Sequence, residues 1–196
     1  SKTRGALPRA LVPFASLQGD CMDMGSWARP AGAAEAQQHR FVFVCVDVVT
    51  RFAWLCTFRG KLTNRKTARC MQGVIKDVRQ RYGAWPRSTV LRTDNGSSDF
   101  GVEFTQVVQQ HEPLITHEHG VANNPNSQAL AEGAVGILRG VLRRMFRAYD
   151  SSDWPEMLAE ANGIMNNRKN AALGYQSPAD VLDGFQDGDD EVVERA

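Results

Sequence analysis

Residues 41–58 have the sequence FVFVCVDVVTRFAWLCTF. The first part, Phe41–Val48, is rich in β-branched and aromatic residues, and Phe52–Phe58 is a second run of the same kind. Only the short link Val49–Arg51 separates them. Two β-type runs joined by so few residues are typical of an antiparallel hairpin. The stretch therefore predicts two neighbouring, mostly buried strands.

The segments on either side of this hairpin alternate between strand and helix patterns. A further strand is expected within residues 14–24. Helical spacing of apolar residues begins at a cap on Asn64 or Thr67 and continues to Tyr82. This order of elements predicts one α/β domain with a mixed sheet flanked by helices. The remaining predicted elements are strands Thr89–Arg92 and Leu114–Thr116 and helices Glu103–Gln110, Ser127–Tyr149, Trp154–Asn167 and a short one from Ser177.

The chain of 196 residues is long enough for one sizeable core. Residues 1–13 carry three basic residues and two prolines, which indicates a basic flexible arm. Residues 185–196 are dominated by aspartate and glutamate, which indicates an acidic tail. The predicted core is therefore residues 14–184.

The composition, 42% hydrophobic and 23% charged, is ordinary for a globular domain. A formal net charge of +1 means that any affinity for nucleic acid must come from local patches. The longest apolar run, Phe41–Val46, is too short to cross a bilayer. The cysteines form no Cys-x-x-Cys pair and the histidines show no familiar zinc spacing. We therefore interpret the cysteines as reduced packing residues of an intracellular protein; they are Cys21, Cys45, Cys56 and Cys70.

Three carboxylates stand where a metal site could form. Asp20 lies in the first predicted strand, Asp94 follows a short strand, and Glu132 lies near the start of the long helix. Converging carboxylates repel one another unless they share a cation, and oxygen ligands favour Mg²⁺ or Mn²⁺ over zinc. Each residue also has a simpler interpretation: a strand acid with a backbone partner, a turn aspartate, and a solvated helix glutamate.

One face of the long helix adds a second pattern. At about 100° per residue, Gln128, Glu132, Arg139 and Arg143 share a narrow face away from the apolar stripe. Such a face would let one helix hold a metal and contact DNA phosphates. A solvated charged face is the alternative interpretation.

The order of these motifs resembles that of retroviral-type integrases, the family that includes the integrases of retroviruses, LTR retrotransposons and Polinton-type elements. Residues 95–131 separate Asp94 from Glu132, close to the spacing of the retroviral D,D-35-E pattern. The resemblance covers about residues 14–184. The segments that carry it are Leu17–Met24, Val46–Trp54, Thr93–Gly96, Asn124–Glu132 and Tyr175–Leu182.

The resemblance implies an RNase H-like fold with a mixed five-stranded sheet, and two Mg²⁺ (or Mn²⁺) ions. Asp20 would bridge both ions, Asp94 would bind one and Glu132 the other. It further implies cleavage near a 3′ end of the element, then attack of the freed 3′-hydroxyl on target DNA. Asn124, Gln128 and Arg139 match positions that approach DNA, and helix geometry adds Arg143.

The implied partners are element ends, target DNA and further copies of the chain, in a homodimer or higher homo-oligomer acting in the nucleus. Two alternatives remain open. One is a domesticated integrase fold that acts as a non-catalytic DNA-binding or assembly subunit. The other is an RNase H-like nuclease that cuts DNA without joining it.

Overall fold

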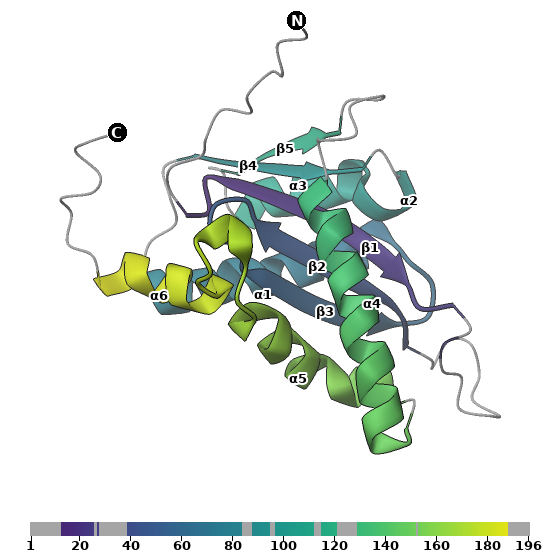
Figure 1. Cartoon of the computed structure of the whole chain (residues 1–196). Helices are drawn as coiled ribbons and strands as arrows, with labels where there is room; N and C mark the ends of the chain where they lie inside the picture. Colours follow the sequence, from purple (N-terminus) through teal and green to yellow (C-terminus); the bar gives the residue numbers. More distant parts are fainter. Residues whose placement is uncertain are drawn as a thin grey trace, which may run out of the picture.

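A mixed five-stranded sheet forms the centre of the molecule, in the order β3-β2-β1-β4-β5 (Figure 1). β1 is antiparallel to β2 and parallel to β4, β2 is antiparallel to β3, and β4 is parallel to β5. The predicted α/β class and hairpin are therefore confirmed. The computed structural model describes residues 13–25, 27, 39–83, 88–94, 97–111, 115–120, 129–151 and 153–187. The strands are β1 (Ser16–Asp23), β2 (His39–Asp47), β3 (Ala53–Arg59), β4 (Thr89–Thr93) and β5 (Ile115–His119).

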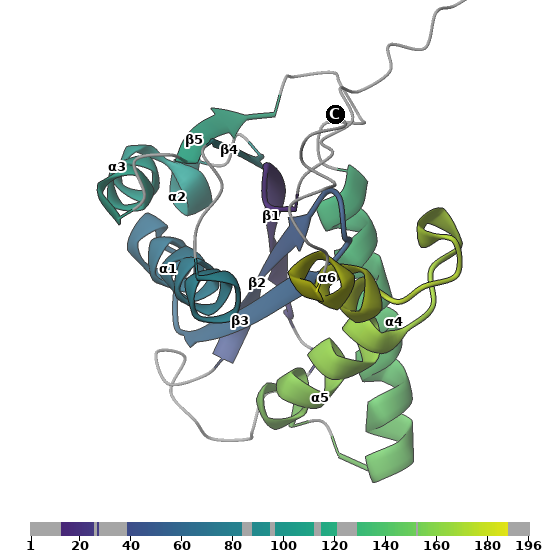
Figure 2. The same ribbon diagram turned by 90° about the vertical axis from the view of Figure 1, so that its left-hand side faces the viewer.

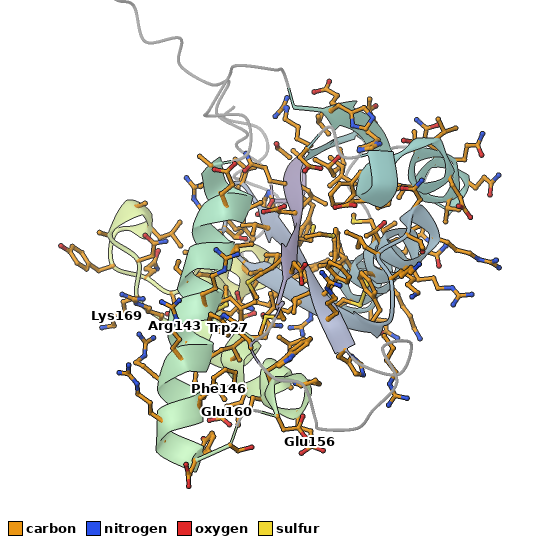
Figure 3. The ribbon with its side chains drawn as sticks, turned by 90° about the vertical axis from the view of Figure 1, so that its right-hand side faces the viewer. Trp27, Arg143, Phe146, Glu156, Glu160 and Lys169 are labelled. Atoms are coloured by element: carbon orange, nitrogen blue, oxygen red, sulfur yellow. A yellow bond between two sulfur atoms is a disulfide. The ribbon has the colours of Figure 1, made fainter. Side chains whose placement is uncertain are left out.

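Helices cover both faces of the sheet. One layer holds α1, α2 and α3, the other holds α4 and α5, and α6 lies next to α5 (Figures 2 and 3). No helix within the described residues is long and apolar enough to cross a membrane. The helices are α1 (Asn64–Tyr82), α2 (Ser97–Phe100), α3 (Val102–His111), α4 (Ala129–Tyr149), α5 (Trp154–Asn167) and α6 (Pro178–Asp187), with a 3₁₀ turn, η2 (Ala171–Leu173), before α6.

Alternation along the strands divides the core in two. On β2, Phe43 and Cys45 belong to the cluster under α1 and α3, whereas Val42, Val44 and Val46 belong to the cluster under α4 and α5. Successive strand residues point to opposite faces, so a continuous apolar run is needed where both faces are covered. This accounts for the unbroken apolar sequence of β2.

The start of α1 differs in detail from the prediction. Thr63 occupies the N-cap position and makes no side-chain cap hydrogen bond. The side chains of the two predicted caps are used elsewhere: Asn64 Oδ1 accepts from the Gly101 N–H at 3.0 Å, and Thr67 Oγ1 donates to the Asp99 carbonyl. These bonds fasten α1 to the segment of α2 and α3 instead.

The buried carboxylate of Asp47 stabilises the β2–β3 turn by accepting hydrogen bonds. Its side chain is fully buried. Oδ2 accepts from the Thr50 N–H at 2.8 Å and the Thr50 hydroxyl at 2.7 Å, and Oδ1 accepts from the Phe14 N–H at 2.9 Å. Burial raises the pKa of Asp47, and these donors oppose the rise. Asp47 therefore serves the fold of this turn.

We expect Asp47→Ala to lower the free energy of unfolding by about 3–5 kcal/mol, because three buried donors lose their acceptor. Chemical denaturation measures the loss. Asp23→Ala is the matched control, since Asp23 forms an exposed ion pair with Arg40 at 2.9 Å. Such a pair contributes about 0–1 kcal/mol. Equal losses for the two variants would contradict the structural role of Asp47.

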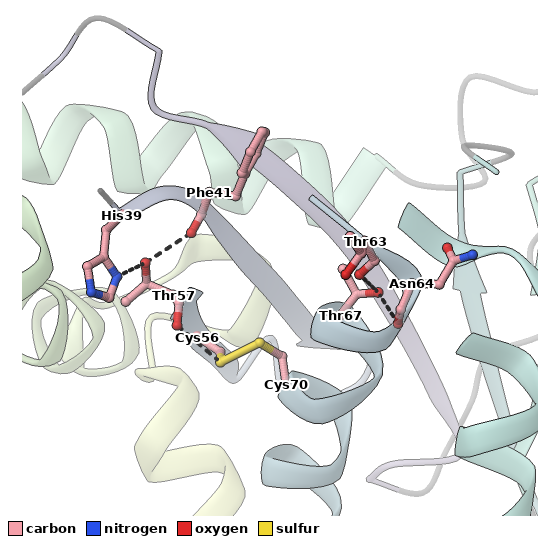
Figure 4. Close-up of a disulfide and its surroundings, with 8 residues drawn as sticks. All are labelled: His39, Phe41, Cys56, Thr57, Thr63, Asn64, Thr67 and Cys70. Atoms are coloured by element: carbon pink, nitrogen blue, oxygen red, sulfur yellow. Dashed lines mark hydrogen bonds between the residues drawn. A yellow bond between two sulfur atoms is a disulfide. The ribbon is translucent and has the colours of Figure 1, made fainter. Parts of the chain in front are cut away.

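Two cysteines are joined, which corrects the interpretation of all four as reduced packing residues. Cys56 on β3 and Cys70 on α1 form a disulfide with their Cα atoms 5.7 Å apart (Figure 4). Cys21 and Cys45 are free. The pair lies among apolar neighbours and its members are 14 residues apart. Sequence alone could not distinguish it from core packing, because the pairing depends on how α1 lies across β3.

Reduction should therefore destabilise the wild-type chain. A disulfide closing a loop of this length contributes about 2–3 kcal/mol by restricting the unfolded chain. We expect dithiothreitol to lower the denaturation midpoint of the wild type and to leave that of the double variant Cys56→Ser/Cys70→Ser unchanged. Thiol titration of the denatured wild type, without reductant, should detect only the thiols of Cys21 and Cys45. A reductant effect of equal size in both proteins would show that the disulfide is not responsible.

Candidate active site

Gln18 fixes the start of α4 against β1. Its side chain is 4% exposed, and Oε1 accepts from the backbone N–H groups of Leu130 at 3.0 Å and Ala131 at 3.3 Å. The first N–H groups of a helix lack partners within the helix, so a side-chain acceptor at this point stabilises the helix end. Glu132 is the next residue along α4, so its position relative to β1 is set by this contact.

Asp20 lies on the same face of β1 as Gln18. Side chains two residues apart on a strand share a face, and Met22, the next in this series, packs in the cluster under α4. Asp20 is half-buried, and its Oδ1 accepts from the N–H of Cys21 at 2.7 Å. The carboxylate therefore faces the layer that contains α4.

Asp94 reaches the same end of the sheet along β4. The parallel register pairs Gly19 with Thr93, so the residue after each, Asp20 and Asp94, continues at neighbouring positions. Glu132 is exposed in the first turn of α4. The acids thus come from β1, the end of β4 and the first turn of α4.

The acidic neighbours of Asp20 act on its carboxylate. The pKa of Asp20 is raised to about 6, first by burial and then by the charges of Asp94 and Glu132, while the Cys21 N–H opposes the rise. A fourth acid, Asp99 of α2, also raises it. No sequence pattern marks Asp99, because its proximity to Asp20 depends on how α2 lies in the fold.

Within the described residues, no three His, Cys, Asp or Glu side chains lie close enough together to hold a metal ion. The donor chemistry nevertheless fits a hard divalent cation. All the acids near Asp20 offer oxygen ligands. Burial and the neighbouring negative charges raise the pKa of Asp20, and a shared cation would offset both effects. Their assignment as metal ligands stays a prediction.

His117 on β5 contacts both β4 and α3, next to Asp94. His117 on β5 lies with Nε2 2.8 Å from the Thr93 hydroxyl and Nδ1 2.5 Å from the Thr105 hydroxyl of α3. Burial, helped by the charge of His119, lowers the pKa of His117 to about 4, so the ring is neutral at neutral pH. The Thr93 hydroxyl also donates to the carbonyl of Asp94 at 3.2 Å. The sequence showed only that the histidines lack zinc spacing.

The predicted basic positions on α4 are both exposed. Arg139 and Arg143 lie two to three turns beyond Glu132, as the helix geometry predicted. The Arg143 guanidinium lies 5.1 Å from the centre of the Trp27 ring, which meets Phe146 edge to face (Figure 3). Asn124 and Gln128, the other predicted DNA-binding residues, lie outside the described residues.

Comparison with solved structures identifies the fold. A chain of the simian T-cell lymphotropic virus intasome, solved with the PP2A regulatory subunit B56 gamma, matches with a TM-score of 0.68 and 21% identity over 90% of this chain and 56% of that one. The BIV integrase catalytic core gives 0.60 and 19% over 88% and 96%, and the HTLV-2 core in complex with magnesium gives 0.62 and 16% over 88% and 99%. The chain has the fold of a retroviral-type integrase core.

Sequence comparison agrees with this integrase fold. The Gag-Pro-Pol polyprotein of squirrel monkey retrovirus is 30% identical over 144 residues, which are 74% of this chain and 7% of the polyprotein. The Pol-related polyprotein of the mouse intracisternal A-particle MIA14 is 25% identical over 143 residues, 73% of this chain and 14% of that one. No family model matches. The integrase-like core thus spans a small part of the polyproteins it matches.

The raised pKa of Asp20 has a measurable consequence. Ionisation of Asp20 costs more in the folded than in the unfolded chain, so this cost is absent below about pH 4 and fully present above about pH 6. We expect Asp20→Asn to stabilise the metal-free chain by about 1–2 kcal/mol at pH 7.5 and by much less at pH 4.5. Urea denaturation at the two pH values measures this, with Glu156→Gln at an exposed position of α5 as control. A gain independent of pH would show that neither burial nor neighbouring charge raises the pKa of Asp20.

Proposed function

We propose that this chain is the catalytic core of a DNA integrase, a polynucleotidyl transferase. In the first reaction it would cut a DNA strand near the 3′ end of a mobile element, with water as the nucleophile. In the second, the new 3′-hydroxyl would attack a phosphodiester of target DNA. The observation that carries this proposal is that the charges of Asp94 and Glu132 raise the pKa of Asp20 within an integrase-type fold.

Asp20, Asp94 and Glu132 would together hold two Mg²⁺ or Mn²⁺ ions. Bound metal ions would activate the attacking oxygen and stabilise the leaving oxygen. Support comes from the oxygen donors of the site and from the HTLV-2 core, which was solved in complex with magnesium. Gln18 would position Glu132 through the start of α4, and the Thr93–His117 contact would position Asp94.

DNA would approach along α4. Arg139 and Arg143 extend the face that begins at Glu132, and Trp27 supports the guanidinium of Arg143. Because the net charge is only +1, contacts of this local kind must supply the attraction to phosphates. The relatives solved as an intasome and as dimeric and trimeric cores support a homo-oligomer as the working form. Action on chromosomal DNA would take place in the nucleus.

Glu132→Gln tests the reaction itself. We expect Mg²⁺- or Mn²⁺-dependent cleavage and joining of short DNA duplexes by the wild type, and at least about a hundredfold less activity in the variant, because a neutral amide is a poor ligand for a hard cation. Glu156→Gln makes the same substitution at an exposed position of α5 and should keep full activity. Gel assays with labelled duplexes measure cutting and joining separately.

The assay also distinguishes the alternatives. Metal-dependent cutting without joining, even with paired element ends, would indicate a nuclease. DNA binding without either reaction, and equal Mn²⁺ affinity of wild type and Glu132→Gln, would contradict catalysis and favour an assembly subunit.

A further inference from the structure

A hollow lies on the flank of α4 that does not carry Glu132. It has a volume of about 510 Å³ and lies between the first turns of α4, the β2–β3 turn and the segment that follows α5. Ala129, Gly133 and Ile137 line it from α4. At about 100° per residue, this face points well away from that of Glu132. The hollow is therefore separate from the carboxylate site.

Three cations line this hollow: Arg51, Arg168 and Lys169. None of the described residues that line it is acidic. The apolar part of the lining includes Val46 and Ala134, and Tyr175 adds an aromatic ring that is 72% exposed. The hollow thus combines a positive rim with an apolar interior.

Arg51 is held in place and lacks a full set of partners. Its backbone has a φ of 64°, a strained conformation for a non-glycine residue, and its N–H donates to the Asp47 carbonyl at 2.9 Å. Nη1 of its guanidinium is buried and makes no hydrogen bond within the described part of the chain. A buried donor of this kind is costly unless an anion or water accepts from it. The turn therefore presents a preorganised cation that needs an acceptor.

The other two cations, Arg168 and Lys169, are exposed and follow directly after an anchored stretch of backbone at the end of α5. Asn166 accepts from the Ala53 N–H and donates to the Ala53 carbonyl, each at 2.8 Å, which clamps this end to β3. Lys169 follows on the segment beside α4 (Figure 3). Asp180 lies near Lys169, but its carboxylate already accepts from the Ser177 N–H at 3.1 Å at the start of α6. The positive end of the α4 dipole also borders the hollow.

We propose that this hollow binds a nucleoside 5′-phosphate. The cations at its rim would hold the phosphate, and Tyr175 with the apolar wall of α4 would hold the base. The volume matches that of small-ligand sites. The ligand is either a free mononucleotide or the 5′-phosphorylated terminal nucleotide of a DNA strand, since both present the same chemistry. The proposal goes beyond the integrase reaction and does not depend on it.

Calorimetric titration of the whole chain with thymidine 5′-phosphate, thymidine and inorganic phosphate tests the proposal. We expect the nucleotide to bind more tightly than either of its parts. Lys169→Gln should weaken nucleotide binding about tenfold, the equivalent of one lost charge-assisted hydrogen bond. Arg51→Gln also alters a strained turn, so the exposed Lys169 carries the test and Arg168→Gln repeats it. The matched control is Lys76→Gln, which removes an exposed cation on α1 and should change nothing.

Short oligothymidylates with a 5′-phosphate or a 5′-hydroxyl distinguish the two sources. Tighter binding of the phosphorylated strand assigns the pocket to a DNA end, and binding of the mononucleotide alone assigns it to a free nucleotide. The proposal is overturned if thymidine 5′-phosphate binds no better than thymidine, if Lys169→Gln and Lys76→Gln behave alike, or if hexaglutamate binds equally well. Glu132→Gln should bind the nucleotide like the wild type, so failure of the integrase reaction would leave this result intact.

Discussion

The contact between Gln18 and the start of α4 is the constraint on which the site depends. A single side-chain oxygen of β1 accepts from the N–H groups of Leu130 and Ala131. The apolar stripe of α4 also packs on the sheet, but hydrophobic attraction has no preferred direction. A directional hydrogen bond fixes the start of the helix against β1. The position of Glu132 relative to Asp20 therefore follows from a buried polar residue on β1, two positions before Asp20.

The same helix serves two different surfaces. One flank of α4 carries Glu132, Arg139 and Arg143, and the other lines the hollow with the cationic rim. Between the two flanks, the stripe that includes Leu138 and Leu142 is buried against the sheet. A helix of 21 residues with three distinct faces needs strict helical periodicity, and its glycines lie on the exposed sides rather than in the stripe. Small residues at Gly133 and Ala129 are what leave room for the hollow.

Sequence patterns predicted the layers of this molecule better than its cross-connections. The hairpin and α5 could be predicted because alternation, helical spacing and Pro155 in a first helical turn are local signals. The Cys56–Cys70 disulfide could not, because it depends on the contact between α1 and β3. The short helix α2 also escaped prediction, because four residues carry no period.

The candidate site shows the same limit. Asp20, Asp94 and Glu132 stood out by motif order, and their roles as ligands remain a prediction. Asp99, the His117 contacts and the buried Arg51 needed the structure, because each gains its meaning from residues far along the chain. Arg51 illustrates this most clearly: its surroundings come from β2, α4 and the segment after α5. The sequence shows only a basic residue in a turn.

The position of β1 at the centre of the sheet limits how this chain can evolve. Gln18 and Asp20 face α4, whereas Leu17 and Cys21 face the layer of α1. Inserting or deleting one residue here would exchange the two sets, exposing the α4 layer to apolar side chains and burying a carboxylate beneath α1. The fold can tolerate single substitutions in β1, because the other side chains keep their facing. It cannot tolerate a change in the length of the strand. Insertions and deletions among natural variants should therefore spare this strand and accumulate in the connections between elements.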